Sequence, residues 1–543
     1  MHVSRSLSWL PRVFVLIILL QAIFFFGIAL QISTLFVWVF SIMSFVPAVV
    51  MCFFSTKDKY VIISLILLFA SQQAIFVFEN PSWGPSYGSD AINDLQTASV
   101  MSTVPHFDLG KLGYTARKSY SYYPMMHLFS VLFSDVSAIP LNSIAIYGIP
   151  FLNAFLVTIA LFYINFNLFG LQGIERNLAT LLFELGFYYT AFHSQFVRET
   201  FAFPLVLLTI MLLSKTMRTK NRTYASIIFL LAIVITLSHQ VTSYVFVAIL
   251  AVLALSYTFF NHDRRANPYF LFGAVVVAAY TAFVTLFFSA NEWMLAIEGL
   301  QSIFVREGTP TVLTSSSRSS LYLSIAYYAM LLVFLIVGSL KLLRNKNKDR
   351  AVLAILAFFM VMFILSVLLR LSTSADPWSW TYYMGLRGTI WAFVGISCVA
   401  TVGLGSIFRI TKGARKPIIL LVILICALVA GKLSQSGSLD TKHADQPVTY
   451  TRYVAATWLK GVTVHGSNMF VAPFPIDSVG FEISRDMAPY AYLKEYFIDE
   501  ERGHFLNSST GYIAFVSYYF DGYRNSTSVQ TIYSNGMVEI GHR

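Results

Sequence analysis

Long apolar runs alternate with short polar segments along most of the chain. A helix that crosses a lipid bilayer needs roughly 17–25 predominantly apolar residues. Such runs predict about 13 transmembrane helices, at residues 13–30, 35–54, 60–78, 144–168, 177–193, 199–214, 224–238, 241–260, 268–289, 320–340, 351–371, 388–408 and 417–435. The pattern therefore predicts a polytopic α-helical membrane protein.

A further apolar stretch, residues 123–134, has a helical pattern but is too short to cross a bilayer. It is predicted to lie in the membrane interface or to re-enter the membrane. We expect it to begin at Pro124, because proline is favoured at the first position of a helix. The stretch belongs to the first long outer segment, residues 79–143, which follows the third predicted span.

The distribution of Lys and Arg orients the helices. With the N-terminus inside, the predicted inner segments hold 20 Lys and Arg, and the outer segments before the C-terminal tail hold 8. Cytoplasmic loops carry such an excess. The pattern predicts a cell (plasma) membrane protein with a cytoplasmic N-terminus and an extracytoplasmic C-terminus. The first apolar run follows a basic segment without a small-residue cleavage site, which predicts a retained signal anchor.

The composition changes after the last predicted span, where residues 434–440 form a polar linker. We therefore predict a transmembrane domain at residues 1–436 and a small soluble extracytoplasmic α/β domain at residues 437–543. Its predicted elements are a helix at residues 450–460 and strands at 467–472, 512–517 and 531–541, the last with an Asn535-Gly536 turn.

Composition agrees with a chain that lies mostly in lipid. Of 543 residues, 57% are hydrophobic and 12% are charged, whereas soluble proteins carry about a quarter charged residues. The net charge of +11 follows from basic loops between spans, so no nucleic-acid partner is predicted. All three cysteines lie in hydrophobic runs, so no disulfide is expected.

Chemically varied side chains collect on the predicted outer face. They include Asp90, Asp94, His127, His193, Arg198, Glu199, His239, Gln240, Arg370 and Arg387. Charged groups at this depth are tolerated where they meet partners or line a wet cavity. Arginine suits phosphate oxygens, histidine can bind phosphate or carry a proton, and a carboxylate can act as a base. The set suits an anionic lipid headgroup with an acceptor arriving from outside.

The layout resembles the GT-C superfamily of integral-membrane glycosyltransferases, particularly archaeal and bacterial multi-pass members with a small extracytoplasmic C-terminal domain. The matching segments in the outer face are Gly88-Ser-Asp90, Tyr122-Tyr-Pro-Met-Met-His127, Phe196-Val-Arg-Glu-Thr200, Leu237-Ser-His-Gln-Val-Thr242 and Gly385-Leu-Arg387. In the tail, Ala455-Ala-Thr-Trp-Leu459 and Ile532-Tyr-Ser-Asn-Gly-Met-Val-Glu-Ile540 resemble the start and the final hairpin of such domains.

The resemblance implies transfer of a sugar from a polyprenyl-phosphate-linked donor, outside the cytoplasm and with inversion at the anomeric carbon. It implies that an acidic residue of the first outer loop, Asp90 or Asp94, deprotonates a glycan, lipid or protein acceptor. It also implies binding of the donor phosphate by basic side chains, which we assign to Arg198, His239, Arg387 and Arg370. We assign substrate contacts to Tyr123, His127, Glu199 and Gln240.

Two features depart from the better-known members. Their acidic loop follows the first span and often has an adjacent Asp-Glu pair, whereas here it follows the third and its acids are four residues apart. No Trp-Trp-Asp signature of the oligosaccharyltransferase branch is present, so a single-sugar or lipid-A-type transferase is nearer. An acid pair can bind Mg²⁺ or Mn²⁺, but no third ligand accompanies it and no metal or other cofactor is predicted.

Two other functions stay open. A lipid-linked glycan polymerase or ligase would share the basic outer cluster and depend on Arg306 and Arg318 in a late outer loop. A transporter or flippase would be expected to have repeats, interrupted spans and midplane sites. The absence of a clear repeat and the concentration of polar residues at one face count against it.

Overall fold

The computed structural model describes residues 10–29, 48–55, 57–79, 89–103, 122–183, 189, 193–219, 221, 223–287, 318–345, 349–372 and 380–410, and five strands between residues 468 and 542. Contacts between residues divide the chain into two compact units. The first unit comprises residues 1–76, 151–193 and 202–440, and the second comprises residues 77–150, 194–201 and 441–543. The predicted division at residue 436 stays a prediction.

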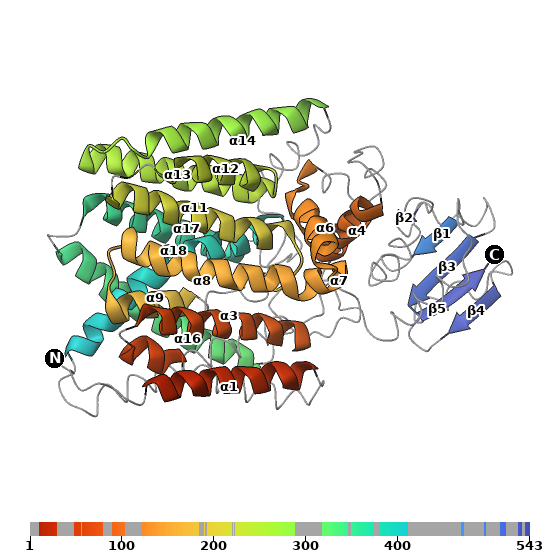
Figure 1. Cartoon of the computed structure of the whole chain (residues 1–543), viewed down its shortest axis with the longest axis horizontal. Helices are drawn as coiled ribbons and strands as arrows, with labels where there is room; N and C mark the ends of the chain where they lie inside the picture. Colours follow the sequence, from red (N-terminus) through yellow and green to blue (C-terminus); the bar gives the residue numbers. More distant parts are fainter. Residues whose placement is uncertain are drawn as a thin grey trace. The chain divides into compact units, whose positions relative to one another are not determined.

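Long helices make up the described part of the first unit, and they run alongside one another (Figure 1). They are α1 (Leu10–Ala29), α3 (Asp58–Glu79), α8 (Ile149–Asn167), α9 (Gly173–Phe183), α11 (Arg198–Thr219), α12 (Ala225–Thr236), α13 (Gln240–Asn261), α14 (Asn267–Phe287), α16 (Arg318–Arg344), α17 (Arg350–Ser372) and α18 (Trp380–Ile410). Residues 48–54 are also helical. Each helix overlaps a predicted span, although α9 ends at Phe183 and matches only the first part of the span predicted at residues 177–193.

Six helices within the described residues are long and apolar enough to cross a membrane: Leu141–Asn167, Arg198–Thr219, Gln240–Asn261, Asn267–Leu286, Arg350–Leu369 and Arg387–Ile407. The predicted span at residues 417–435 lies outside the described residues, so the count of 13 stays a prediction. The described part of the chain is confirmed as mainly helical, with several helices that have the length and composition of membrane spans.

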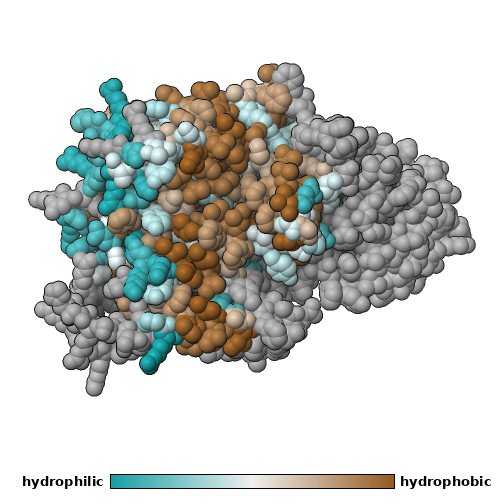
Figure 2. Space-filling view, in the orientation of Figure 1, coloured by the Kyte–Doolittle hydropathy of each residue, from teal (hydrophilic) through white to brown (hydrophobic). Residues whose placement is uncertain are grey.

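Apolar side chains cover the outside of this helix bundle. Leu271, Val275 and Leu286 of α14 are more than half exposed, as are Leu365 and Leu368 of α17. Figure 2 shows such residues as a broad hydrophobic band across the helices, with hydrophilic residues gathered at one end. In a bilayer, lipid chains cover such a surface, because they are as apolar as leucine.

Small residues let α18 approach its neighbours closely. A Cβ atom on Gly338 of α16 would collide with the carbonyl oxygen of Val399, and one on Gly403 of α18 would collide with that of Phe334. A Cβ on Gly395 would lie 2.5 Å from the Cβ of Phe359 in α17. Close backbone approach through small residues is the usual way for helices to associate in membranes.

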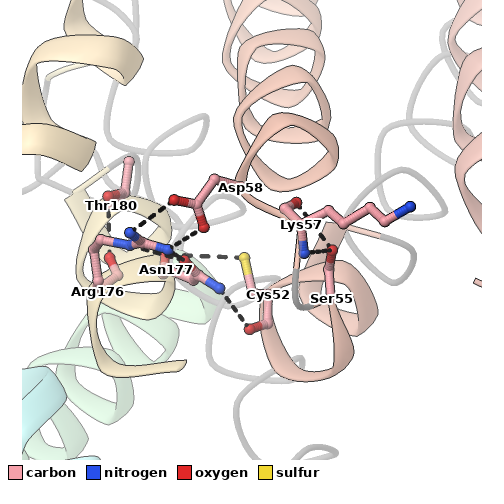
Figure 3. A network of polar contacts seen from close by, with 7 residues as sticks. All are labelled: Cys52, Ser55, Lys57, Asp58, Arg176, Asn177 and Thr180. Carbon is pink, nitrogen blue, oxygen red and sulfur yellow. Dashed lines mark hydrogen bonds and ion pairs between the residues drawn. The ribbon is translucent and has the colours of Figure 1, made fainter. Parts of the chain in front are cut away.

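A polar network ties α9 to α3 and to the helical stretch 48–54 (Figure 3). The guanidinium of Arg176 donates to both carboxylate oxygens of Asp58, at 2.5 and 3.1 Å. It also lies 3.9 Å from the ring centre of Phe162. Next to it, the side-chain amide of Asn177 donates to the carbonyl of Cys52 at 3.0 Å. The network connects three segments that are far apart in the sequence.

Short helices and a sheet make up the described part of the second unit. The helices are α4 (Ser89–Thr103), α6 (Met125–Ser137), α7 (Leu141–Ser143) and the π-helical turn η2 (Ile144–Gly148). Helix α6 confirms the short predicted helix at residues 123–134 and begins directly after Pro124. It packs on α4, α7 and η2, and η2 leads directly into α8.

Five strands form one mixed sheet in the order β2-β1-β3-β5-β4. They are β1 (Asn468–Val471), β2 (Leu493–Glu495), β3 (Gly511–Val516), β4 (Gln530–Ser534) and β5 (Val538–His542). Strand β1 runs parallel to β2 and β3, and the other pairs are antiparallel. Strand β2 was not predicted. The predicted helix 450–460 and the Asn535-Gly536 turn lie outside the described residues, so the α/β class stays a prediction.

Candidate functional site

Asp94 lies in the middle of the buried face of α4. Ala91, Leu95 and Ala98 are fully buried, and Asp94 is 1% exposed. These residues have the i, i+3, i+4, i+7 spacing of one helix face. Burying a carboxylate costs free energy unless hydrogen-bond donors surround it. Asp94 is therefore expected to have donors from neighbouring elements.

His127 of α6 supplies the first donor. Its Nε2 lies 2.8 Å from Oδ1 of Asp94, and both side chains are buried. An ionised carboxylate only accepts hydrogen bonds, so the Nε2–H of the imidazole donates. This contact leaves Nδ1 as the acceptor atom of a neutral ring. Nδ1 is buried and has no hydrogen-bond partner among the described residues.

Arg198, the first residue of α11, supplies two more contacts. Its backbone N–H donates to Oδ2 of Asp94 at 3.2 Å, and its Nε lies 3.1 Å from Oδ1. The guanidinium carbon is 5.8 Å from the centre of the buried Tyr123 ring. Asp94 therefore stands at the N-terminus of α11, where the helix dipole stabilises a negative charge.

Asp94, His127 and Arg198 form one cluster with the ring of Tyr123 beside the guanidinium, and the three charged or titratable side chains at its centre are called here the outer triad cluster, after the predicted outer face. All four lie in the second unit. With a neutral imidazole, the carboxylate and the guanidinium balance each other in charge. The arrangement holds an arginine at a helix N-terminus, a site that suits anionic oxygens, beside a histidine whose orientation a carboxylate fixes.

The two neighbouring candidates, Asp90 and Glu199, lie on the same helices. Asp90 is in the first turn of α4, one turn before Asp94, and only its backbone is described. Glu199 is the second residue of α11 and is 1% exposed. The structure therefore brings four of the predicted site residues into contact and places these two beside them in the chain.

The remaining predicted site residues belong to the first unit. His239 is the N-cap of α13, and its Nδ1 accepts from the backbone N–H of Thr242 at 3.3 Å. Gln240 is half-buried, with Nε2 at 3.4 Å from the hydroxyl of Tyr244. Arg387 is half-buried inside α18, which begins seven residues earlier than that arginine. Arg370 is in the last turn of α17, and its side chain lies outside the described part.

A second polar cluster was only partly anticipated. In the first unit the amide oxygen of Asn153 accepts from the Tyr189 hydroxyl at 2.9 Å and from Gln73 at 3.3 Å. The Asn153 amide nitrogen lies 3.3 Å from Nδ1 of His193. Sequence reasoning named His193 but not the other three residues. Gln72-Gln73 and Asn153 inside apolar runs were the signal, because polar residues in a span need partners.

No group of three or more His, Cys, Asp or Glu side chains that could hold a metal ion occurs within the described residues. The outer triad cluster has two such side chains, Asp94 and His127, and its third member is an arginine, which cannot ligate a cation. The prediction that the protein works without a metal stays a prediction.

Helices and cluster together define a polytopic membrane protein with a buried carboxylate–histidine–arginine site, formed by the short helices α4 and α6 and the first residue of the long apolar helix α11. Comparison with solved structures shows that the chain has the GT-C fold that the resemblance implied, whereas the count of 13 helices and the α/β C-terminal domain stay predictions. No protein-family model matches the chain, and no curated protein sequence matches it.

Among the similar solved structures is that of ArnT from Cupriavidus metallidurans bound to undecaprenyl phosphate, with 11% identity and a TM-score of 0.53. The match covers 88% of this chain and 97% of that one. The apo state of the same protein matches with 10% identity, a TM-score of 0.52 and the same coverage. The Archaeoglobus fulgidus oligosaccharyltransferase in complex with zinc and sulfate matches over 79% of this chain and 62% of that one, with 14% identity and a TM-score of 0.47.

Proposed function

We propose that this protein is a membrane glycosyltransferase that transfers a sugar from a polyprenyl-phosphate-linked donor to an acceptor on the extracytoplasmic side. The observation that carries the proposal is the outer triad cluster, in which Asp94, His127 and Arg198 meet on a GT-C fold. The structure of ArnT, which has this fold, is bound to undecaprenyl phosphate. That likeness supports a lipid phosphate as the anion recognised here.

Arg198 is the proposed ligand of the donor phosphate. It combines a guanidinium with the first turn of α11, whose N–H groups and dipole attract anions. Its side chain is 13% exposed, so the guanidinium is shielded enough for a bound charge to be attracted more strongly than in water. Negative charge that builds on the leaving phosphate during transfer would be stabilised by this fixed positive charge.

Removal of the proton from the acceptor hydroxyl requires a carboxylate of α4. The candidates are Asp90 and Asp94, as predicted. As the acceptor oxygen forms its bond to the anomeric carbon, the bond from that carbon to the phosphate oxygen breaks. The proton leaves the acceptor, and polyprenyl phosphate leaves as an anion. Attack from the side opposite the phosphate gives inversion.

The other assignments complete the proposal. His239, Arg387 and Arg370 remain proposed contacts of the lipid phosphate, and Tyr123, Glu199 and Gln240 remain proposed contacts of the sugar or acceptor. The excess of Lys and Arg in alternate loops supports a cytoplasmic N-terminus and an extracytoplasmic C-terminus. The acceptor is a glycan, a lipid or a protein.

Purified protein in liposomes tests the proposal. Radiolabelled polyprenyl-phosphate sugars and a panel of acceptors should give a transferred product that depends on the protein. Arg198→Gln should raise the KM for the donor by about tenfold or more, because it removes a charged contact to phosphate worth about 1.5–3 kcal/mol. Full activity in both Asp90→Asn and Asp94→Asn would remove the proposed chemistry.

Product analysis separates the alternatives. A polymerase would give a ladder of chain lengths that changes in Arg306→Gln or Arg318→Gln. A transporter would move labelled cargo into liposomes without forming a new glycosidic bond. Either result in place of single-sugar transfer would contradict the proposal.

A further inference from the structure

The imidazole of His127 is oriented as a base would be. One ring nitrogen, Nε2, is 2.8 Å from Oδ1 of Asp94. The other, Nδ1, is directed away from that contact and is without a hydrogen-bond partner in the part of the chain that the structure describes. A carboxylate on one nitrogen fixes the tautomer, and the lone pair of the opposite nitrogen is then available to take a proton.

Asp94 itself is poorly placed to meet an acceptor. Its Oδ1 faces Nε2 of His127 and Nε of Arg198, and its Oδ2 accepts from the backbone N–H of Arg198. Burial does not distinguish the two groups, because the side chain of His127 is 0% exposed and that of Asp94 is 1% exposed; their hydrogen-bond partners do. Both oxygens therefore already have donors, and an acceptor hydroxyl would have to displace one of them to reach the carboxylate.

His127 lies on the buried face of α6, together with three other residues. The buried residues of this helix are Met126, His127, Ser130 and Val131, which share one face of α6, and that face packs on α4. The buried hydroxyl of Ser130, one turn further on, is satisfied within α6 by the carbonyl of Met126 at 2.8 Å. Among the four, the imidazole alone reaches across to a charged group of α4 in the described structure.

We propose that His127 is the group that takes the proton from the acceptor hydroxyl, with Asp94 as the residue that positions it. This inference rests on the proposed function and names the base within the same site. The acceptor O–H gives its proton to Nδ1 while its oxygen attacks the anomeric carbon and the bond to the donor phosphate breaks. The resulting imidazolium is stabilised by Asp94, and polyprenyl phosphate carries away the negative charge.

In the described part of the chain, charged and titratable groups reach this pair from α11 and from the segment before α6. Arg198 of α11 contacts Asp94, and Tyr123, four residues before His127, contacts the guanidinium of Arg198. Arg198 pairs with Asp94 and so offsets the carboxylate's charge in the resting site. When His127 takes the proton it gains a positive charge, and the leaving phosphate gains a negative charge in the same step, so the net charge of the site does not change.

Two conservative variants test the inference. In His127→Gln the amide nitrogen takes the place of Nε2 and can still donate to Asp94, and in His127→Asn the amide occupies the place of Nδ1. Neither amide can accept a proton. We expect kcat for transfer to fall by about 10²–10⁴-fold in both. Binding of undecaprenyl phosphate, measured by fluorescence titration in detergent, should stay within about threefold.

Rescue distinguishes chemistry from packing. In His127→Ala, added imidazoles of similar size and different basicity should restore transfer at rates that increase with basicity, as for a general base. Ser130→Ala on the same helix face is the matched control and should keep wild-type kcat. Because residues that act as a unit are not additive, the loss of kcat in Asp94→Asn/His127→Gln should be smaller than the product of the two single losses.

Several results would overturn the inference. One is a kcat within about threefold of wild type in His127→Gln or His127→Asn. Another is a loss of undecaprenyl phosphate binding as large as the loss of transfer, and a third is rescue that ignores basicity. If wild-type protein transfers no sugar but binds the lipid phosphate, the proposed function fails instead, and the two failures are distinguishable.

Discussion

The contact between Asp94 and Arg198 should be energetically strong, and a double-mutant cycle can measure it. At 3.1 Å, two unit charges attract each other by about 5 kcal/mol at an effective dielectric constant of about 20. A double-mutant cycle isolates this pairwise attraction from the cost of removing each ion from water. Because the guanidinium keeps 13% exposure, water weakens the attraction. We expect a net coupling of about 2–3 kcal/mol.

The cycle uses Asp94→Asn and Arg198→Met, which keep the size of each side chain. The backbone N–H of Arg198 still reaches position 94 in every variant, so the coupling reports the guanidinium alone. Unfolding free energies come from SDS titration in mixed micelles, followed by fluorescence. A coupling below about 0.5 kcal/mol, the scatter expected for independent sites, would refute the buried ion pair.

The ion pair between Asp58 and Arg176 provides the matched control (Figure 3). Its bidentate geometry is closer than that of the outer pair, at 2.5 and 3.1 Å, but the side chain of Asp58 is 52% exposed. Exposed pairs typically couple by about 0–1 kcal/mol. Asp58→Asn and Arg176→Met should therefore couple more weakly than the outer pair. The reverse order would mean that geometry outweighs burial in this protein.

Three further outcomes follow from the helices. Gly338→Leu should abolish folded protein in size-exclusion profiles, because a side chain there meets the backbone at Val399. His239→Ala should lower stability to SDS by about 1 kcal/mol, through loss of the N-cap contact to Thr242. A nitroxide on Leu132→Cys, at a position that is 62% exposed on α6, should collide more often with oxygen than with a nickel chelate in bilayers. The opposite preference would place α6 in water.

Helices with strong local signals could be predicted closely. The span predicted at residues 224–238 is found as α12 (Ala225–Thr236), followed by α13 at Gln240. The two are separated by Leu237, Ser238 and His239, of which His239 is the N-cap of α13. Helix α18 was harder, because Trp380 to Tyr383 are largely aromatic and fit an interfacial turn equally well. They continue the helix, so Arg387 lies inside it rather than before it.

Whether a strand of the C-terminal region could be predicted depended on how many residues showed the alternating pattern. Three predicted runs correspond to β1, β3 and the β4–β5 hairpin. Strand β2 (Leu493–Glu495) has only three residues and carries two charged side chains, so it has no alternation of the kind that identifies a strand. Strand β2 is defined by its pairing with β1, a tertiary contact that cannot be predicted from the local sequence.

The site illustrates what spacing reveals and what it leaves open. The sequence places Asp94 at the centre of a stripe with Ala91, Leu95 and Ala98, and this helical spacing alone indicates burial. Burial then requires donors, and the outer segments offer only a limited set. Which donors are used depends on how α4 packs, because His127 is 33 residues away and Arg198 is 104 residues away.

The same packing bears on the choice between Asp90 and Asp94, which the sequence left open. Asp90 and Asp94 share a helix and are one turn apart, so any local rule gives them similar roles. The three contacts to Asp94 commit it to holding an imidazole and a helix N-terminus in place. A carboxylate committed in that way acts on a substrate through the groups that it orients. The chemistry of this site is therefore expected to depend on His127 and Arg198, whose functional atoms Asp94 positions.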